Sequence, residues 1–282
     1  MSQGIIIFAQ NNADVDYIKL ATFSAQQAKK HLDLPVSLIT DSRSWLETSQ
    51  PDHPFDQVID VEYTVTAQRK KFYDGALTSK SLEWKNFARN RAYDLSPYDT
   101  TLVIDSDYII NTSNLKSAFD RDVELQIYSK STDLASWRNA DEFKRINEFS
   151  IPFYWATAFI FQKNQITQAF FDLVAYIKSN WNYYRILYNI DTILFRNDYA
   201  FSIAIHIMNG KSTDGFVIEL PGSMVYTTDK DLVVAGKDSK MQFLIEKENH
   251  PGECLMIKTS DLDVHIMNKF SLSRYIDGGY GV

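Results

Sequence analysis

The segment Thr100–Asn111, TTLVIDSDYIIN, places two carboxylates inside an apolar run. Apolar residues 102–104 precede Asp105, and apolar residues 108–110 follow Asp107. A run this apolar is typical of a strand buried on both faces. Buried carboxylates are costly unless they are paired or bound to a metal. We therefore expect the strand to end at Asp105 and to carry both carboxylates to the C-terminal edge of an α/β sheet, where ligands bind.

The Asp-x-Asp spacing alone has little value, because it occurs five times, at 14/16, 105/107, 120/122, 229/231 and 261/263. The other four pairs lie in polar surroundings that are typical of a solvated turn or a helix start. Only Asp105 and Asp107 are embedded in apolar sequence. The alternative interpretation of this pair is that one Asp caps the following turn and the other pairs with Lys or Arg.

Composition limits the class of protein. The 282 residues suffice for one large domain or a domain with an appendage, and 45% hydrophobic with 23% charged residues indicates a globular chain. The net charge of −7 disfavours a general nucleic-acid binder but leaves room for a local basic patch. Cys254 is the single cysteine, which excludes an internal disulfide and a thiolate zinc site. Neither a signal peptide nor a membrane-spanning apolar run is present, so we expect a cytoplasmic protein.

The hydrophobic pattern predicts alternating strands and helices. Strands at 4–9 and 35–40 flank a helix within 13–32, a βαβ unit that implies a parallel sheet. A short strand at 55–63, a basic patch at 69–71, a turn at 73–75 and a helix from Ser79 to about Tyr93 come before the Asp-x-Asp strand. We then expect strands within 123–128 and 151–161, helices within 137–148 and 165–180, and a buried helix capped by Asp198 and stopped by Gly210. The pattern ends with one or two strands in 216–235, a loop at 236–253 and a short strand at 255–257.

The LVIDSD strand, after the expected basic helix, resembles the Asp-x-Asp motif of GT-A type nucleotide-sugar glycosyltransferases, especially the family-eight, glycogenin-like group. Further segments carry the resemblance over most of the chain: IIIFAQNN, ITDS, YWATAFIFQKN, FRNDYAFSIAIH and DVHIMNK. The resemblance implies a GT-A (Rossmann-like) α/β/α sandwich with a mixed, mostly parallel sheet. It implies a single domain over 1–282, with the nucleotide-binding part at about 1–111 and the acceptor and sugar part at about 112–282.

The resemblance also implies roles for individual residues. Asp105, Asp107 and His265 would bind Mn²⁺ or Mg²⁺, and Asp198, with Asp191 as the alternative, would lie near the anomeric carbon. The nucleotide sugar would contact Ala9, Gln10, Asn11, Asn12, Asp41, Lys80, Lys85, Arg89, Ser106 and Lys269, with Arg89 preferred as the diphosphate ligand from its segment. The chain departs from the family where Trp155-Ala156-Thr157-Ala158 replaces Asn-x-Gly, and where the His265 to Lys269 spacing is shorter than in His-x-x-Gly-x-x-Lys.

The predicted function is a metal-dependent glycosyltransferase that moves a sugar from a nucleoside-diphosphate sugar, commonly a UDP-sugar, to an acceptor hydroxyl with retained configuration. The acceptor class stays open between a saccharide, a protein and a modified nucleobase, a homodimer is a candidate assembly, and the source would be a bacterium or phage. One alternative is a sugar-phosphate nucleotidyltransferase, but residues 10–13 lack the glycines of its phosphate loop. Another is a catalytically inactive nucleotide-sugar-binding protein of the same fold, against which the intact Asp105, Asp107 and His265 count.

Overall fold

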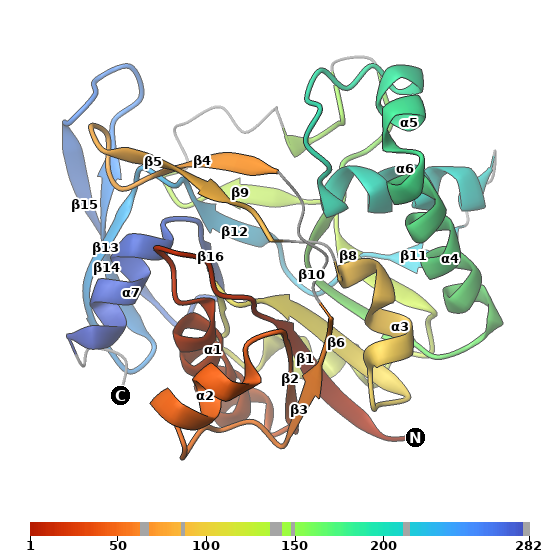
Figure 1. The fold of residues 1–282 in the computed structure, drawn as a ribbon. Coiled ribbons are helices and arrows are strands. Elements are labelled where there is room, and N and C mark those ends of the chain that lie inside the picture. The colour runs from red at the N-terminus through yellow and green to blue at the C-terminus, as the bar shows by residue number, and fades with distance from the viewer. Residues whose placement is uncertain (63–67, 86–87, 136–142, 148–149, 211–214, 279–282) are drawn as a thin grey trace.

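The centre of the molecule is a seven-stranded sheet, seen in a computed structural model that describes residues 1–62, 68–85, 88–135, 143–147, 150–210 and 215–278 (Figure 1). Neighbours β1, β2, β3 and β6 run parallel, β10 is antiparallel to β6 and β8, and β11 is parallel to β8. The predicted mixed, mostly parallel sheet is therefore confirmed. Its strand order is β11 (Val217–Ile218), β8 (Leu125–Tyr128), β10 (Trp155–Gln162), β6 (Thr100–Asp105), β1 (Gln3–Phe8), β2 (Val36–Thr40) and β3 (Gln57–Asp60).

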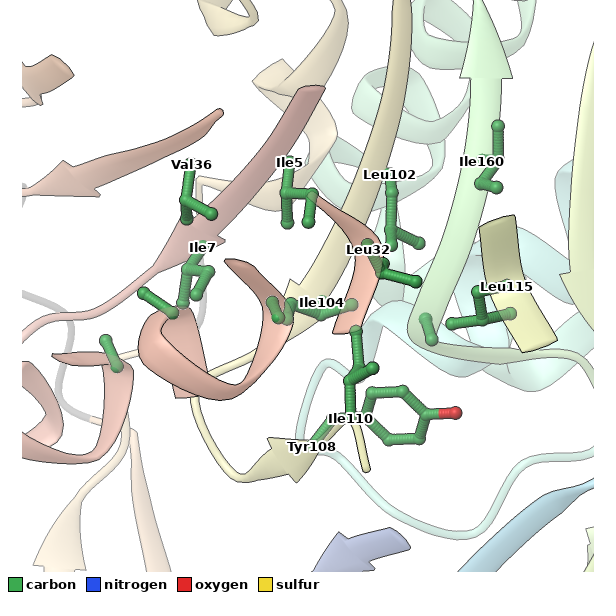
Figure 2. Packing of buried hydrophobic residues seen from close by; sticks show 14 of the residues in the cluster. Ile5, Ile7, Leu32, Val36, Leu102, Ile104, Tyr108, Ile110, Leu115 and Ile160 are labelled. Atoms are coloured by element: carbon green, nitrogen blue, oxygen red, sulfur yellow. The ribbon is translucent and has the colours of Figure 1, made fainter. Parts of the chain in front are cut away.

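One face of this sheet is covered by α1 (Tyr17–Leu32), the helix of the predicted βαβ unit. The helix begins after Asp16, whose side chain accepts a hydrogen bond from the Lys19 amide, a typical N-cap. Its apolar stripe packs on alternate residues of β1 and β6, and Figure 2 shows Leu32 beside Leu102 and Ile104 in this core. Each fully buried Ile or Leu side chain contributes about 1.5–3 kcal/mol relative to exposure. The short α2 (Arg43–Ser49) adds Leu46 to the same core.

The other face is covered by helices from the second half of the chain and by one short helix before β6 (Figure 1). Val103 and Phe159 point to this side and pack with Phe170 and Phe201. A capping box, in which Asn164 and Thr167 exchange hydrogen bonds, starts the longest of these helices. The arrangement is thus the expected three-layer α/β/α sandwich. The helices are α3 (Ala92–Leu95), α4 (Gln165–Ser179), α5 (Trp181–Leu187) and α6 (Asn197–Asn209).

Smaller sheets lie at the C-terminal edge of the central sheet and share a third core with α1 and α7 (Lys269–Asp277). One sheet has the order β7 (Tyr108–Ile109), β16 (Val264–Ile266), β12 (Met224–Thr227) and β9 (Ser131–Asp133). The other two are β13 (Leu232–Lys237), β14 (Lys240–Glu246) and β15 (Cys254–Ser260), and the hairpin of β4 (Arg69–Tyr73) and β5 (Ser79–Glu83). Among the helices that the structure describes, none combines the length and apolar character needed to cross a membrane.

Several predicted elements are wrong. The helix expected from Ser79 to Tyr93 is instead β5, a 3-10 turn at Arg89–Arg91 and α3, because β4 supplies a ladder partner for 79–83. The loop expected at 236–253 contains β14, and α7 was not expected. The helix expected at 137–148 lies partly outside the described residues, and 143–147 form no α-helix. Arg196, rather than Asp198, occupies the N-cap of α6, whereas Gly210 ends this helix as predicted, with φ +56°.

Candidate active site

The ends of three strands of the central sheet meet at one edge. The registers of parallel β1 and β6 place Phe8 beside Asp105, so both strands end together. Because β10 runs the opposite way, its N-terminal residues Trp155 and Thr157 lie at that same edge. All four residues line one pocket of about 180 Å³. The C-terminal edge at which the sequence predicts Asp105 is therefore the edge where this pocket lies.

The pairing of β7 with β16 brings His265 to the Asp-x-Asp segment. His265 lies opposite Tyr108, and the Ile266 amide donates a 2.9 Å hydrogen bond to the Asp107 carbonyl. As a result, ligand atoms of Asp105, Asp107 and His265 lie within 4.8 Å of one another. The structure thus brings together the three residues expected to bind metal.

The Asp107 carboxylate is the most buried acid of this cluster, at 3% exposed. Its Oδ2 atom lies 2.6 Å from Lys269 Nζ and 3.4 Å from His265 Nε2. Burial raises the pKa of Asp107, but the charges of Lys269 and His265 lower it more, so this pKa lies well below its usual range. Burial lowers the pKa of Lys269, but Asp107 raises it to about 12 overall. Asp107 and Lys269 are therefore both charged at neutral pH.

Arg89 connects Asp105 to the neighbouring strand β10. Its guanidinium pairs with the Asp105 carboxylate and donates a 2.5 Å hydrogen bond to the Ala156 carbonyl. The Arg89 residue is only 3% exposed although it carries a full charge. A buried guanidinium requires such partners, because an unpaired charge in this environment is strongly destabilising. Arg89 therefore fixes the position of Asp105 and brings a positive charge to the pocket wall.

Asp198 lies in the first turn of α6. Its Oδ1 accepts a 3.0 Å hydrogen bond from the Ala156 amide, and its Oδ2 lies 2.8 Å from Arg196 Nη2. The Ser202 hydroxyl links α6 to the Tyr154 amide at 2.8 Å. The N-terminal end of a helix stabilises a carboxylate through its dipole. Asp198 is thus held rigidly and lines the same pocket as Asp105.

The pocket walls carry charges of both signs. The cationic lining residues are Lys70, Lys85, Arg89, Arg196 and Lys269, and the acidic ones are Asp105, Asp107, Asp198 and Asp229. Lys70 belongs to the basic patch at 69–71, which the sequence leaves open between a solvated face and a phosphate contact. The sequence pattern points to neither Arg196 nor Asp229, since the Asp229–Asp231 pair lies in polar sequence.

Asp229 reaches the pocket because its loop neighbour Asp231 holds the turn after β12. The buried Asp231 carboxylate accepts hydrogen bonds from the Thr228 amide at 2.7 Å and the Glu246 amide at 3.1 Å. Burial raises the pKa of Asp229, although nearby lysines, including Lys70, lower it in part. The two carboxylates of this pair therefore differ: one builds the turn and the other faces the pocket.

Among the residues expected to contact a nucleotide, Gln10, Lys85, Arg89, Ser106 and Lys269 line the pocket.

Other expected contacts have local roles in the structure. The Asn12 and Asn11 side chains accept hydrogen bonds from the Val15 and Ile18 amides at the start of α1. The Ala9 amide donates to the Ile39 carbonyl at 3.1 Å, within the sheet.

Charged residues expected near the substrate also divide between the pocket and the surface. The Asp41 Oδ2 atom lies 3.5 Å from Lys85 Nζ, and Lys85 lines the pocket. Lys80 lies on the β4–β5 hairpin and forms a 2.6 Å ion pair with Asp14. Asp191 is exposed and is not among the residues that line the pocket. Of the two expected carboxylates near the anomeric carbon, the structure places only Asp198 in the pocket.

The donor atoms of the acidic cluster suit a divalent cation. Two carboxylates and one imidazole form a ligand set compatible with Mn²⁺ or Mg²⁺ when substrate phosphates complete the coordination. The His265 Nδ1 atom is buried and has no hydrogen-bond partner within the described part of the chain. Buried polar atoms of this kind are normally satisfied. The residues therefore fit a metal-binding role.

No protein-family model matches this chain, and no curated protein matches it in sequence. Solved structures with a similar fold include the glycosyltransferase GlyE in Streptococcus pneumoniae TIGR4, which is 13% identical over 78% of this chain and 45% of that chain, with a TM-score of 0.45. The galactosyltransferase LgtC, in complex with donor and acceptor sugar analogues, is 14% identical over 77% of this chain and 72% of that chain, with a TM-score of 0.44.

The bifunctional IspDF from Campylobacter jejuni is 12% identical over 79% of this chain and 50% of that chain, with a TM-score of 0.40. The chain thus spans about half the length of GlyE and of IspDF. GlyE and LgtC belong to the glycosyltransferases, the class that the sequence resemblance predicts.

Proposed function

We propose that this protein is a metal-dependent glycosyltransferase that uses a nucleoside-diphosphate sugar, with a UDP-sugar as the first donor to test. The observation that carries the proposal is the cluster of Asp105, Asp107 and His265, whose ligand atoms lie within 4.8 Å of one another at the C-terminal edge of the sheet. Such an edge is the usual ligand site of an open α/β sheet. The surrounding cations suit a diphosphate better than a neutral ligand.

The proposed roles follow from charge and position. A divalent cation held by the three ligands would neutralise the diphosphate leaving group. Lys269 and Arg89 are positioned to share that negative charge, since both line the pocket and contact the acidic cluster. Because Lys269 and Arg89 are buried and held by Asp107 and Asp105, they are already oriented before the substrate binds, and such preorganisation favours developing charge.

The sugar would lie toward Asp198 and Asp229, whose carboxylates can accept hydrogen bonds from sugar hydroxyls. Trp155, which is 1% exposed, forms part of the same wall. In the proposed reaction the bond from the anomeric carbon to the diphosphate oxygen breaks, a bond to the acceptor oxygen forms, and the acceptor hydroxyl loses its proton. The proposal includes retention of configuration at the anomeric carbon, with a saccharide, a protein or a modified nucleobase as the acceptor.

A thermal-shift titration with UDP and Mn²⁺ tests the proposal. Ligand at about 100 times its dissociation constant stabilises the folded state by about 2.7 kcal/mol, which corresponds to roughly 5–10 °C in a domain of this size. We expect this shift to require both ligands and to disappear in Asp107→Ala. Asp120→Ala is the matched control, because Asp120 belongs to an exposed pair of identical spacing and should leave the shift intact.

Product assays on the same protein identify the donor and distinguish glycosyl transfer from nucleotidyl transfer. Release of UDP from a UDP-sugar panel supports glycosyl transfer or its slow hydrolytic counterpart. Pyrophosphate release from UTP or CTP with a sugar phosphate would instead support the nucleotidyltransferase. If no nucleotide changes the melting temperature with or without Mn²⁺, the proposed function is wrong.

A further inference from the structure

The strand β15 forms an open edge of the β13–β14–β15 sheet. All seven of its residues pair with β14 in an unbroken antiparallel register. Within the described part of the chain, no strand pairs with its other side. An edge strand presents a row of unpaired backbone N–H and C=O groups, which are a template for another strand. Figure 1 shows β15 at the outer border of the molecule, away from the central sheet.

Other sheet edges in the structure have features that discourage pairing. The central sheet ends in β3, with four residues, and β11, with two. On the far side of the β15 sheet, β13 has an irregular register between Val233 and Ala235 and packs against α7. Short length, bulges and covering helices are the usual protections of an edge. β15 is longer and regular, and it has neither proline nor a bulge.

The side chains of β15 are unusually apolar for an exposed strand. Leu255 is 44% exposed and Met256 is 57% exposed, and Ile257 is half-buried. Lys258 is the only charged residue of the strand. An exposed, regular and apolar edge is predicted to associate with another strand.

We propose that β15 pairs with β15 of a second copy of this chain, and so joins the two sheets across a two-fold axis at Ile257. A two-fold interface uses the same patch on both subunits, which an antiparallel strand pair satisfies. In the register that overlaps the full strand, Ile257 lies opposite itself and Met256 lies opposite Lys258. Leu255 lies opposite Thr259, and Cys254 lies opposite Ser260. No like charges meet within the strand.

Charge at the ends of the strand is compatible with this pairing. In this register Glu253, just before β15, lies opposite Asp261, and an ion pair with Lys247 at 3.0 Å offsets part of its charge. Asp261, just after β15, has a left-handed backbone conformation with φ +51°, so the chain turns away from the strand direction there. The aliphatic stem of Lys258 can cover the Met256 side chain of the partner. The occupant that this surface fits is therefore its own copy.

Opposite charges introduced at one position test the register. Met256→Lys places a lysine opposite Lys258 twice, once on each side of the axis, and should weaken the dimer by roughly 2- to 30-fold, whereas Met256→Glu should strengthen it by a similar factor. The double variant M256K/K258E should restore the affinity. Met256 is exposed, so the variants should keep the fold, which circular dichroism checks. Sedimentation velocity of the full chain measures the dissociation constant.

A distance measurement gives an independent readout. Spin labels on the exposed native Cys254 should lie about 20 Å apart in the dimer before allowance for the linker, because Cys254 and Ser260 are six residues apart at about 3.4 Å each. Ile186→Lys, on the exposed face of α5, is the matched control and should leave the affinity unchanged. A monomer at submillimolar concentration, equal affinities for both Met256 variants, or a dimer lost only in Ile186→Lys would overturn the proposal.

Discussion

Replacing Lys269 with Met removes the cation nearest to the most buried carboxylate of the site. Lys269 Nζ lies 2.6 Å from Asp107 Oδ2, and the two side chains are 15% and 5% exposed. The methionine stem preserves most of the volume, so the main loss is electrostatic. The remaining neighbour, His265 Nε2, is 3.4 Å from the same oxygen and is charged only when protonated. The substitution therefore leaves a negative charge buried with little compensation.

The size of this effect follows from the burial. Removing one partner of a buried ion pair typically costs about 3–5 kcal/mol, because the other charge is left uncompensated. In a domain of this size each kcal/mol lowers the melting temperature by about 2–4 °C. We expect Lys269→Met to melt roughly 6–20 °C below the parent in the presence of EDTA.

Mn²⁺ distinguishes a charge effect from a packing effect. If Asp107 lacks a cation in the variant, Mn²⁺ should restore more stability to Lys269→Met than to the parent. Lys80→Met is the control, because the exposed Lys80–Asp14 pair should contribute only about 0.2–1 kcal/mol. Differential scanning calorimetry measures both. A melting temperature of Lys269→Met within two degrees of Lys80→Met in EDTA would refute the argument.

Two further substitutions test other parts of the structure. Arg274 on α7 forms a two-point ion pair with Asp74 at 2.7 and 2.8 Å. This pair holds the pKa of the Asp74 carboxyl below its usual range. Its stabilisation of the fold is therefore present above about pH 4 and is lost as the pH falls through the lowered pKa. Arg274→Gln should cost about 0.2–1 kcal/mol at pH 7 in urea unfolding, and the difference should shrink as the pH falls below about 4. Gly4→Ala should cost about 1–3 kcal/mol, because the new Cβ would lie 2.4 Å from the Tyr98 ring; an unchanged unfolding midpoint would contradict this.

The sequence predicted the parts of the fold that depend on local pattern. The βαβ unit, the Asp105 strand and the helix at 165–180 all have a periodicity that one buried face produces. Only the family resemblance predicted that His265 lies close to Asp107. The sequence pattern could not, because β7 and β16 are short and their pairing joins distant parts of the chain. Asp229 was missed for a related reason: its exposure to the pocket depends on the turn that Asp231 builds through tertiary hydrogen bonds.

The largest error, the helix expected from Ser79, has a physical cause that bears on the site. In β5 only Leu82 is buried, and in β4 only Phe72 is, so neither strand shows the alternation that would reveal it. The hairpin exists because the two strands pair and because Phe72 and Leu82 enter the third core.

This hairpin places two residues of β4, Lys70 and Phe72, in the pocket wall. Its turn is joined to α7 by the Asp74–Arg274 pair, and α7 begins with Lys269, the cation at Asp107. Displacement of the hairpin would therefore act on Lys269 through α7. Hydrogen exchange of residues 69–83 in Arg274→Gln measures that connection: faster exchange together with weaker UDP–Mn²⁺ stabilisation would show that the hairpin helps to position the cation, whereas faster exchange alone would show that it does not.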